Sequence, residues 1–182
     1  PKLIGAASES GAEVFEVNYF DRLAYVAHSP QFYKPMAMAR GFELLFEVGP
    51  VFRAEKSYTN THTTEFSGFD LEFSYITSFK DVMKMEEELL TYMLKAVKEK
   101  YGEEIEELFG KEVIVPTTPF PVIKLADLYD ELEKEFGYTV PDSEKGDLTT
   151  DAERLSYDWV MKKYGHEFLF ITDYSAEKRA FY

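Results

Sequence analysis

The 182-residue chain contains no cysteine. Disulfide scaffolds, zinc sites built on thiolates and cysteine nucleophiles are therefore excluded. No apolar run approaches the ~20 residues that a bilayer-spanning helix needs, and no basic segment precedes a hydrophobic stretch as in a signal peptide. These absences predict a soluble, cytoplasmic protein with no membrane partner.

Positive charge is scarce, since 20 Lys and Arg residues stand against 34 Asp and Glu, a formal net charge of -14. An acidic surface repels phosphate backbones, so we do not expect nonspecific nucleic-acid binding by this chain alone. A local site for ATP or an RNA end is still compatible with this charge. Hydrophobic residues make up 45% of the chain and aromatic residues 16%, which is ample for a packed core.

Both ends of the sequence are unusual for a complete protein. The chain begins with Pro1-Lys2-Leu3-Ile4, without an initiator methionine, and ends on Ala180-Phe181-Tyr182. Each end reads as if it were cut through structure. We therefore expect a fragment of a longer protein.

Helix signals occur at two places in the first 110 residues. Ser29 and Pro30 predict the start of a helix over about 30–39. Ser78 and Asp81 fit a capping box, and apolar residues at helical spacing predict a long helix that ends before Gly102.

Two short strands are predicted over 43–48 and 51–55, separated by a Gly-Pro turn at 49–50. The segment 66–75 alternates cleanly, with Phe69, Leu71, Phe73 and Tyr75 on one face. Residues 150–164 read as a helix and 168–172 as a buried strand. The sum predicts an α+β fold, a largely antiparallel sheet flanked by helices.

The segments 51–55 and 66–75 carry the residues with chemical potential. Arg53 and Glu55 share one strand face, as do Asp70 and Glu72. A forked guanidinium suits phosphate oxygens, whereas paired carboxylates suit Mg²⁺ or an ammonium group. An ordinary antiparallel hairpin with one solvated face explains the same pattern, so both interpretations stay open at this point.

Several segments resemble a known family in order and spacing. The segment 46–75 resembles motif 2 of the class II aminoacyl-tRNA synthetases, through Phe52-Arg53-Ala54-Glu55 and Thr64-Glu65-Phe66-Ser67-Gly68-Phe69-Asp70-Leu71-Glu72. The second run is most similar to aspartyl-tRNA synthetases of the archaeal and eukaryotic type. Three further segments agree with that family: Pro1-Lys2-Leu3-Ile4 with the following Ser8-Glu9-Ser10-Gly11, Ser29-Pro30-Gln31-Phe32-Tyr33-Lys34, and Arg179-Ala180-Phe181-Tyr182.

The resemblance implies an ATP site and a catalytic residue. Arg53 would be catalytic, gripping the α-phosphate of ATP and the acyl carboxylate. Glu55 would bind near the adenine or the tRNA 3′ end, His62 would approach the γ-phosphate, and Phe66 would stack on adenine. Taken alone, His62 reads as an ordinary solvated loop residue, and Phe66 is compatible with a core aromatic.

The resemblance also implies an aspartate pocket. Gln31, Lys34 and Asp70 would form it, with Lys34 as the cation for the side-chain carboxylate. Asp70 would hold the α-ammonium group or orient Lys34. Glu9 would reach the ammonium group when its loop closes over the substrate, although taken alone it reads as an ordinary loop residue.

In this family the chain would be an incomplete catalytic domain over 1–182, with a more variable helical segment over 103–165. Motif 3 and the anticodon-binding domain would be absent, and with motif 3 the carboxylate that anchors Mg²⁺, so no metal ligand is assigned here. Thr61 stands where the family often has an arginine. The fragment itself would be inactive.

The implied function is that of an aspartate–tRNA ligase. The parent protein would be a homodimer that joins L-aspartate to tRNA with ATP and Mg²⁺. Three alternatives remain: an aspartate-activating asparagine synthetase, an asparaginyl-tRNA synthetase, and a noncatalytic synthetase-like interaction module.

Overall fold

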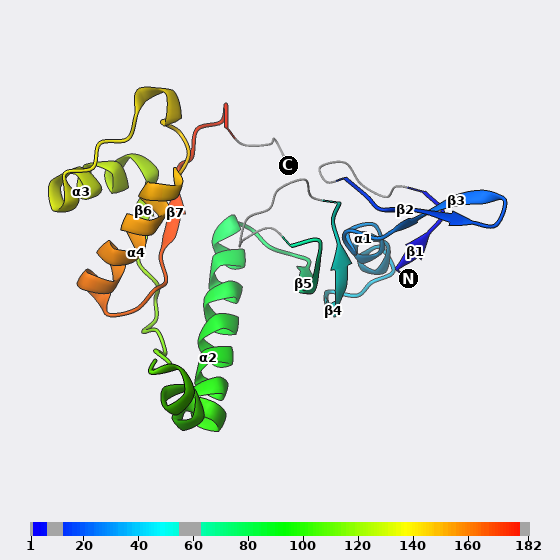
Figure 1. Cartoon of the computed structure of the whole chain (residues 1–182), viewed down its shortest axis with the longest axis horizontal. Coiled ribbons are helices and arrows are strands. Elements are labelled where there is room, and N and C mark those ends of the chain that lie inside the picture. The colour runs from blue at the N-terminus through cyan, green and yellow to red at the C-terminus, as the bar shows by residue number, and fades with distance from the viewer. Residues whose placement is uncertain (1, 7–12, 55–62, 179–182) are drawn as a thin grey trace. The chain divides into compact units, whose positions relative to one another are not determined.

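Three antiparallel strands begin the first of two units, Pro1–Thr77 and Ser78–Tyr182, into which the chain divides (Figure 1). The structure is a computed structural model that describes residues 2–6, 13–54 and 63–178. The strands are β1 (Leu3–Ile4), β2 (Glu16–Tyr19) and β3 (Arg22–Val26), in the order β1-β3-β2.

The hairpin that follows is the main feature of the first unit. Strand β4 (Leu44–Phe52) pairs along its whole length with the antiparallel strand β5 (Glu65–Phe73). The prediction of two short strands separated by a turn at 49–50 is therefore wrong. Gly49 and Pro50 lie inside β4, opposite Gly68 and Ser67.

Pro50 is accommodated because of the direction in which its nitrogen points. The Arg53 N–H donates to Thr64 O across the hairpin (2.9 Å), and the Phe52 N–H donates to Ala27 O on the other side (3.4 Å). Successive residues of a strand direct their N–H groups to opposite edges. The nitrogen of Pro50, two residues before Phe52, therefore points away from β5. Its missing N–H removes no hydrogen bond between β4 and β5.

Helix α1 (Tyr33–Met38) packs against β4 and β5. It begins three residues later than predicted, because the residues after Ser29 form a turn, in which the Gln31 N–H donates to Ser29 Oγ (3.0 Å). The Lys34 N–H reaches back to Pro30 O (3.2 Å) and leads the turn into the helix. Lys34 is the buried residue of α1.

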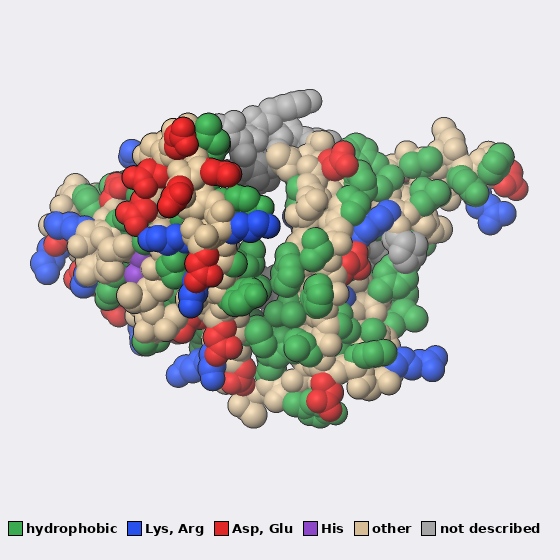
Figure 2. Space-filling view, turned by 90° about the horizontal axis from the view of Figure 1, so that it is seen from below, with side chains coloured by type: hydrophobic (Ala, Val, Ile, Leu, Met, Phe, Trp, Pro, Cys, Tyr) green, Lys and Arg blue, Asp and Glu red, His purple; other side chains and the backbone are tan. Residues whose placement is uncertain are grey.

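The predicted alternation of the β5 segment is confirmed as far as Phe73, where the strand ends. Tyr75 is highly exposed and has a positive φ of 61°, so it does not continue the apolar face as predicted. That face is itself exposed, and Figure 2 shows green hydrophobic side chains gathered over the hairpin. Its exposed members are Leu44, Phe46, Val48 and Phe69.

The second unit opens with α2 (Phe79–Phe109), a helix of 31 residues. The predicted capping box is confirmed: the Lys80 N–H donates to Ser78 Oγ and the Ser78 N–H to Asp81 Oδ2. The predicted end before Gly102 is wrong. The helix continues through Gly102 and ends at Gly110, whose φ of 61° is the left-handed conformation typical of a helix C-terminus.

The core of the second unit lies between α3 (Leu125–Phe136) and α4 (Thr150–Tyr164). The bounds of α4 confirm the helix predicted over 150–164. A short 3₁₀ turn at Asp142–Glu144 stands between them. The buried members of this core are Leu128, Leu132, Val140, Ala152, Trp159 and Val160.

Strands β6 (Val122–Lys124) and β7 (Phe170–Thr172) form a parallel pair, with both helices in the connection between them. Strand β7 lies within the strand predicted over 168–172, but its residues are only half-buried. The parallel pairing was not predicted. The α+β expectation is confirmed for the two antiparallel sheets and their helices, and no helix in the described ranges is long and apolar enough to cross a membrane.

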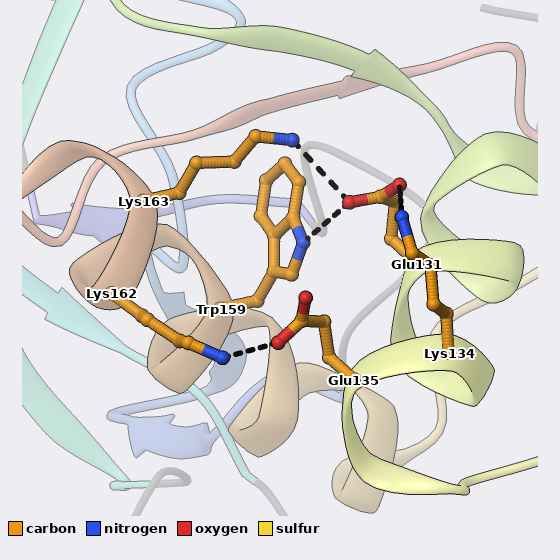
Figure 3. A network of polar contacts seen from close by, with 6 residues as sticks. All are labelled: Glu131, Lys134, Glu135, Trp159, Lys162 and Lys163. Atoms are coloured by element: carbon orange, nitrogen blue, oxygen red, sulfur yellow. Dashed lines mark hydrogen bonds and ion pairs between the residues drawn. The ribbon is translucent and has the colours of Figure 1, made fainter.

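A polar network covers the α3–α4 contact around Trp159, the only tryptophan of the chain (Figure 3). The indole Nε1–H donates to Glu131 Oε2 (3.0 Å), and Lys163 Nζ lies 3.3 Å from the same oxygen. Lys162 pairs with Glu135 beside them. Charged side chains from the two helices thus lie around the edge of a buried aromatic ring.

Candidate functional site

The β4–β5 hairpin sorts its side chains onto an apolar face and a polar face. Because side chains alternate along a strand, odd-numbered residues of β4 share the polar face with even-numbered residues of β5. Glu47 lies directly opposite Asp70, and Val51 lies opposite Phe66. Glu72 follows Asp70 on the same face.

Lys34 enters this polar face from α1 and contacts both β5 carboxylates. Its ammonium group is bonded to Asp70 Oδ1 and lies 3.1 Å from Glu72 Oε2. Burial by itself lowers the pKa of Lys34, but the hydrogen bonds to Asp70 and Glu72 outweigh it and raise the pKa above its ordinary value. Lys34 therefore stays protonated between two carboxylates.

Sequence reasoning did not identify a second lysine on this face. Lys2 Nζ lies 2.5 Å from Glu47 Oε1, and the two residues are 45 positions apart in the sequence. Glu47 and Asp70 would repel each other across the hairpin, because like charges that face each other on paired strands are destabilising. Each of these two carboxylates is instead matched by a lysine from outside the hairpin.

The other end of the polar face holds Arg53 and Phe66. The Arg53 guanidinium carbon lies 5.4 Å from the centre of the Phe66 ring, a cation–π contact. Arg53 Nε is buried and has no acceptor within the described ranges of the chain. A buried guanidinium N–H without a partner is costly, and a phosphate or carboxylate oxygen would satisfy it.

Two glycines separate the charged end from the Arg53–Phe66 end. Gly49 lies opposite Gly68, so neither strand has a side chain there. A Cβ added at Gly68 would lie only 3.1 Å from Val51 Cγ2, and one added at Gly49 would lie 3.5 Å from Lys2 Nζ. The polar face therefore has bare backbone between its two groups of side chains.

The other predicted site residues are less closely gathered. Gln31 lies in the turn before α1, three residues from Lys34, and its side chain is exposed. Glu9, Glu55 and His62 lie outside the described residues, so their roles stay predictions. Lys34, Asp70, Arg53 and Phe66 share the polar face, although their contacts with a substrate also stay predictions.

The described residues do not fit a metal ion. The pair of carboxylates Asp70 and Glu72 suits Mg²⁺ or an ammonium group, and the group between them is the ammonium of Lys34. Elsewhere in the described ranges, no cluster of three or more metal-ligating side chains is present. We therefore derive no chemical step through Mg²⁺.

Comparison with known proteins gives this site a context. The family model described as tRNA synthetases class II (D, K and N) matches residues 1–182. The chain is 40% identical over 183 residues to the aspartate–tRNA(Asp/Asn) ligase of Aeropyrum pernix, with all of this chain and 41% of the relative covered. It is 43% identical over 182 residues to the corresponding ligase of Methanopyrus kandleri, covering 40% of it.

Solved structures agree with these matches. The asparaginyl-tRNA synthetase of Pyrococcus horikoshii, complexed with asparaginyl-adenylate, matches all of this chain with a TM-score of 0.75 and 35% identity, and 40% of its own chain is covered. The aspartyl-tRNA synthetase of Entamoeba histolytica matches 87% of this chain with a TM-score of 0.73 and 32% identity, and 32% of its own chain is covered. The chain thus spans about two fifths of the length of the Aeropyrum and Methanopyrus ligases. By its whole length, the chain belongs to the class II tRNA synthetases of the D, K and N group.

Proposed function

We propose that this chain is part of the catalytic domain of an aspartate–tRNA ligase. The complete protein would activate L-aspartate with ATP and transfer it to the terminal adenosine of tRNA. The observation that carries the proposal is the polar face of the β4–β5 hairpin. It combines Lys34, held between Asp70 and Glu72, with Arg53, whose buried Nε has no acceptor in the described part of the chain.

The charged end of this face has the chemistry of an amino-acid pocket. A lysine ammonium has three protons, and Asp70 and Glu72 accept two of those of Lys34. Among the described residues the third has no acceptor, so it can serve the side-chain carboxylate of aspartate. Glu47, Asp70 and Glu72 carry one more charge than Lys2 and Lys34 together, an excess that attracts the α-ammonium group of the substrate.

The other end has the chemistry of a nucleotide site. Phe66 offers an aromatic surface for adenine, and the Arg53 guanidinium can bind phosphate oxygens. In the proposed reaction, an α-carboxylate oxygen of aspartate attacks the α-phosphorus of ATP. The bond from that phosphorus to the bridging oxygen breaks, and pyrophosphate leaves with the electron pair. Arg53 would stabilise the charge that develops on the α-phosphate.

The remaining roles follow the family resemblance. Gln31 and Glu9 would contact aspartate, whereas Glu55 and His62 would contact ATP. Mg²⁺ would accompany ATP and would be held by a carboxylate of motif 3, outside this chain. Motif 3 and the anticodon-binding domain would lie elsewhere in the complete protein, which we expect to be a cytoplasmic homodimer.

Amino-acid-dependent exchange of pyrophosphate into ATP tests the proposal directly. The complete protein would be assayed with aspartate, asparagine and lysine in parallel. We expect exchange with aspartate alone, followed by transfer of labelled aspartate to tRNA. Exchange with asparagine instead would favour the asparaginyl-tRNA synthetase alternative, which the 35% identity to the Pyrococcus enzyme keeps relevant.

Two other outcomes separate the remaining alternatives. Exchange with aspartate, followed by transfer to ammonia and not to tRNA, would identify an asparagine synthetase. Silence with all three amino acids would overturn the proposal and favour a noncatalytic interaction module.

A further inference from the structure

We propose that Lys2 is a positioning residue for the amino-acid end of the site. Its ion pair with Glu47 neutralises a carboxylate that would otherwise repel an acidic substrate. Lys2 acts through Glu47 and contacts no reacting atom. The inference rests on the proposed function, since it takes aspartate as the substrate.

The first step is the position of Glu47. It pairs in register with Asp70, and side chains directly opposite each other have Cβ atoms about 4.5–5.5 Å apart. The carboxylate of Glu47 therefore lies beside the cluster formed by Lys34, Asp70 and Glu72. A charge at that distance, with the Glu47 side chain only 41% exposed, is incompletely screened by solvent.

The second step is the charge of the cluster. Three carboxylates, Glu47, Asp70 and Glu72, are matched by two lysines, which leaves one negative charge. That charge suits the single ammonium group of an amino acid. Without Lys2 the excess becomes two, and the side-chain carboxylate of aspartate then meets a more repulsive site.

The third step separates this role from that of a simple tether. The start of β1 is held by its backbone, because the Ala27 N–H donates to Lys2 O (2.8 Å) and β1 pairs with β3 through Leu3 and Ile4. The Lys2 side chain is not needed for that pairing. Its ammonium instead lies over the bare backbone at Gly49 and reaches Glu47.

The test is a double-mutant cycle in the complete protein, with KM for aspartate and for ATP measured by pyrophosphate exchange. Lys2→Met should raise the KM for aspartate about tenfold, the size of effect that a charge has when it shifts the pKa of a neighbour by about one unit. The KM for ATP should stay unchanged. Glu47→Gln alone should not raise the KM for aspartate, since it removes a carboxylate that Lys2 already neutralises. The double variant should return close to the wild-type KM.

A tether predicts a different pattern, because either single substitution would break the same contact. Equal increases in KM for Lys2→Met and Glu47→Gln, without recovery in the double variant, would overturn the inference. So would a wild-type KM for Lys2→Met. Lys2→Arg should preserve the KM, and Lys95→Met, on an exposed lysine of α2, controls for the loss of a positive charge elsewhere.

Two further controls keep the outcome readable. Each variant is melted beside the wild type, and if Lys2→Met does not fold, Lys2→Gln and the double variant replace it. If the wild type shows no exchange with aspartate, the proposed function fails and this inference fails with it. An active wild type with the tether pattern overturns this inference alone.

Discussion

The guanidinium of Arg53 lies over the ring of Phe66, with 5.4 Å between its central carbon and the ring centre. The ring orients the flat cation, and Arg53 Nε remains buried without an acceptor in the described ranges. An aromatic ring that positions an incompletely bonded cation is a prepared site for an anion. In the proposed reaction that anion is the α-phosphate of ATP.

Arg53→Ala should reduce aspartate-dependent pyrophosphate exchange by at least about 100-fold, the scale for losing a group that stabilises transition-state charge. Arg53→Lys should recover only part of this rate, because an ammonium group cannot reproduce the planar fork. Arg22→Ala, on an exposed arginine of β3, is the matched control. Near-normal exchange by Arg53→Ala would contradict the catalytic assignment.

Lys34→Met should weaken aspartate binding far more than ATP binding. We expect the KM for aspartate to rise by more than about tenfold, because the substrate carboxylate loses its cation and then meets unpaired Asp70 and Glu72. The KM for ATP should change by less than about twofold, since Arg53 and Phe66 are untouched. Equal increases for both ligands would mean that Lys34 supports the site in general.

Two glycines of α2 should respond to alanine with opposite signs. Gly102 lies inside the helix, and an added Cβ would meet only Lys98 Cγ at 3.5 Å, so Gly102→Ala should stabilise the protein by about 0.5–1 kcal/mol. Gly110 has a left-handed backbone, so Gly110→Ala should destabilise it by about 1–2 kcal/mol. Urea unfolding followed by circular dichroism measures both. Shifts of the same sign would contradict the helix end at Gly110.

Acid should loosen the contact between α3 and α4. The hydrogen bond from the Trp159 indole, and then that from Lys163, lower the pKa of Glu131 below its ordinary value of 4.5. Because the pKa is lower in the folded state, this carboxylate contributes stability above its ordinary pKa and loses it as the pH falls through the folded value. Trp159 fluorescence should therefore be constant from pH 7 to 5 and change below about pH 4.5.

A pair of variants assigns that acid response. Glu131→Gln should weaken the pH dependence of Trp159 fluorescence, since the titrating partner is gone. Glu104→Gln, on an exposed residue of α2, should leave it as in the wild type. An unchanged acid response in Glu131→Gln would show that another group is responsible. The change in Trp159 fluorescence with pH should be small even in the wild type, because the lysine partners are solvent-exposed.

Much of the fold could be predicted where the signal is local. The capping box at Ser78 and the alternation through Phe73 depend on neighbouring residues, and both are confirmed. The local preferences of glycine and proline predict the wrong boundaries where long-range strand pairing or helix continuation outweighs them. Gly102 does not end α2, because the helix continues through Phe109 to the true cap at Gly110.

The candidate site could be predicted only in part, for the same reason. The shared face of Asp70 and Glu72 followed from strand geometry, but Lys34 was associated with Asp70 through family resemblance. The pairing of Lys2 with Glu47 had no local signal, since it joins residues 45 positions apart. It also required a single uninterrupted β4, which the apparent turn at Gly49 concealed.

Pro50 has a consequence for the behaviour of the hairpin in solution. The edge of β4 that faces away from β5 lacks a backbone donor at Pro50, just before Phe52 makes its bond to Ala27. A strand of another molecule that paired with this edge would lack one backbone hydrogen bond at Pro50. A strand edge interrupted in this way is a poor template for aggregation. This protection matters because the apolar face of the same hairpin exposes several large side chains.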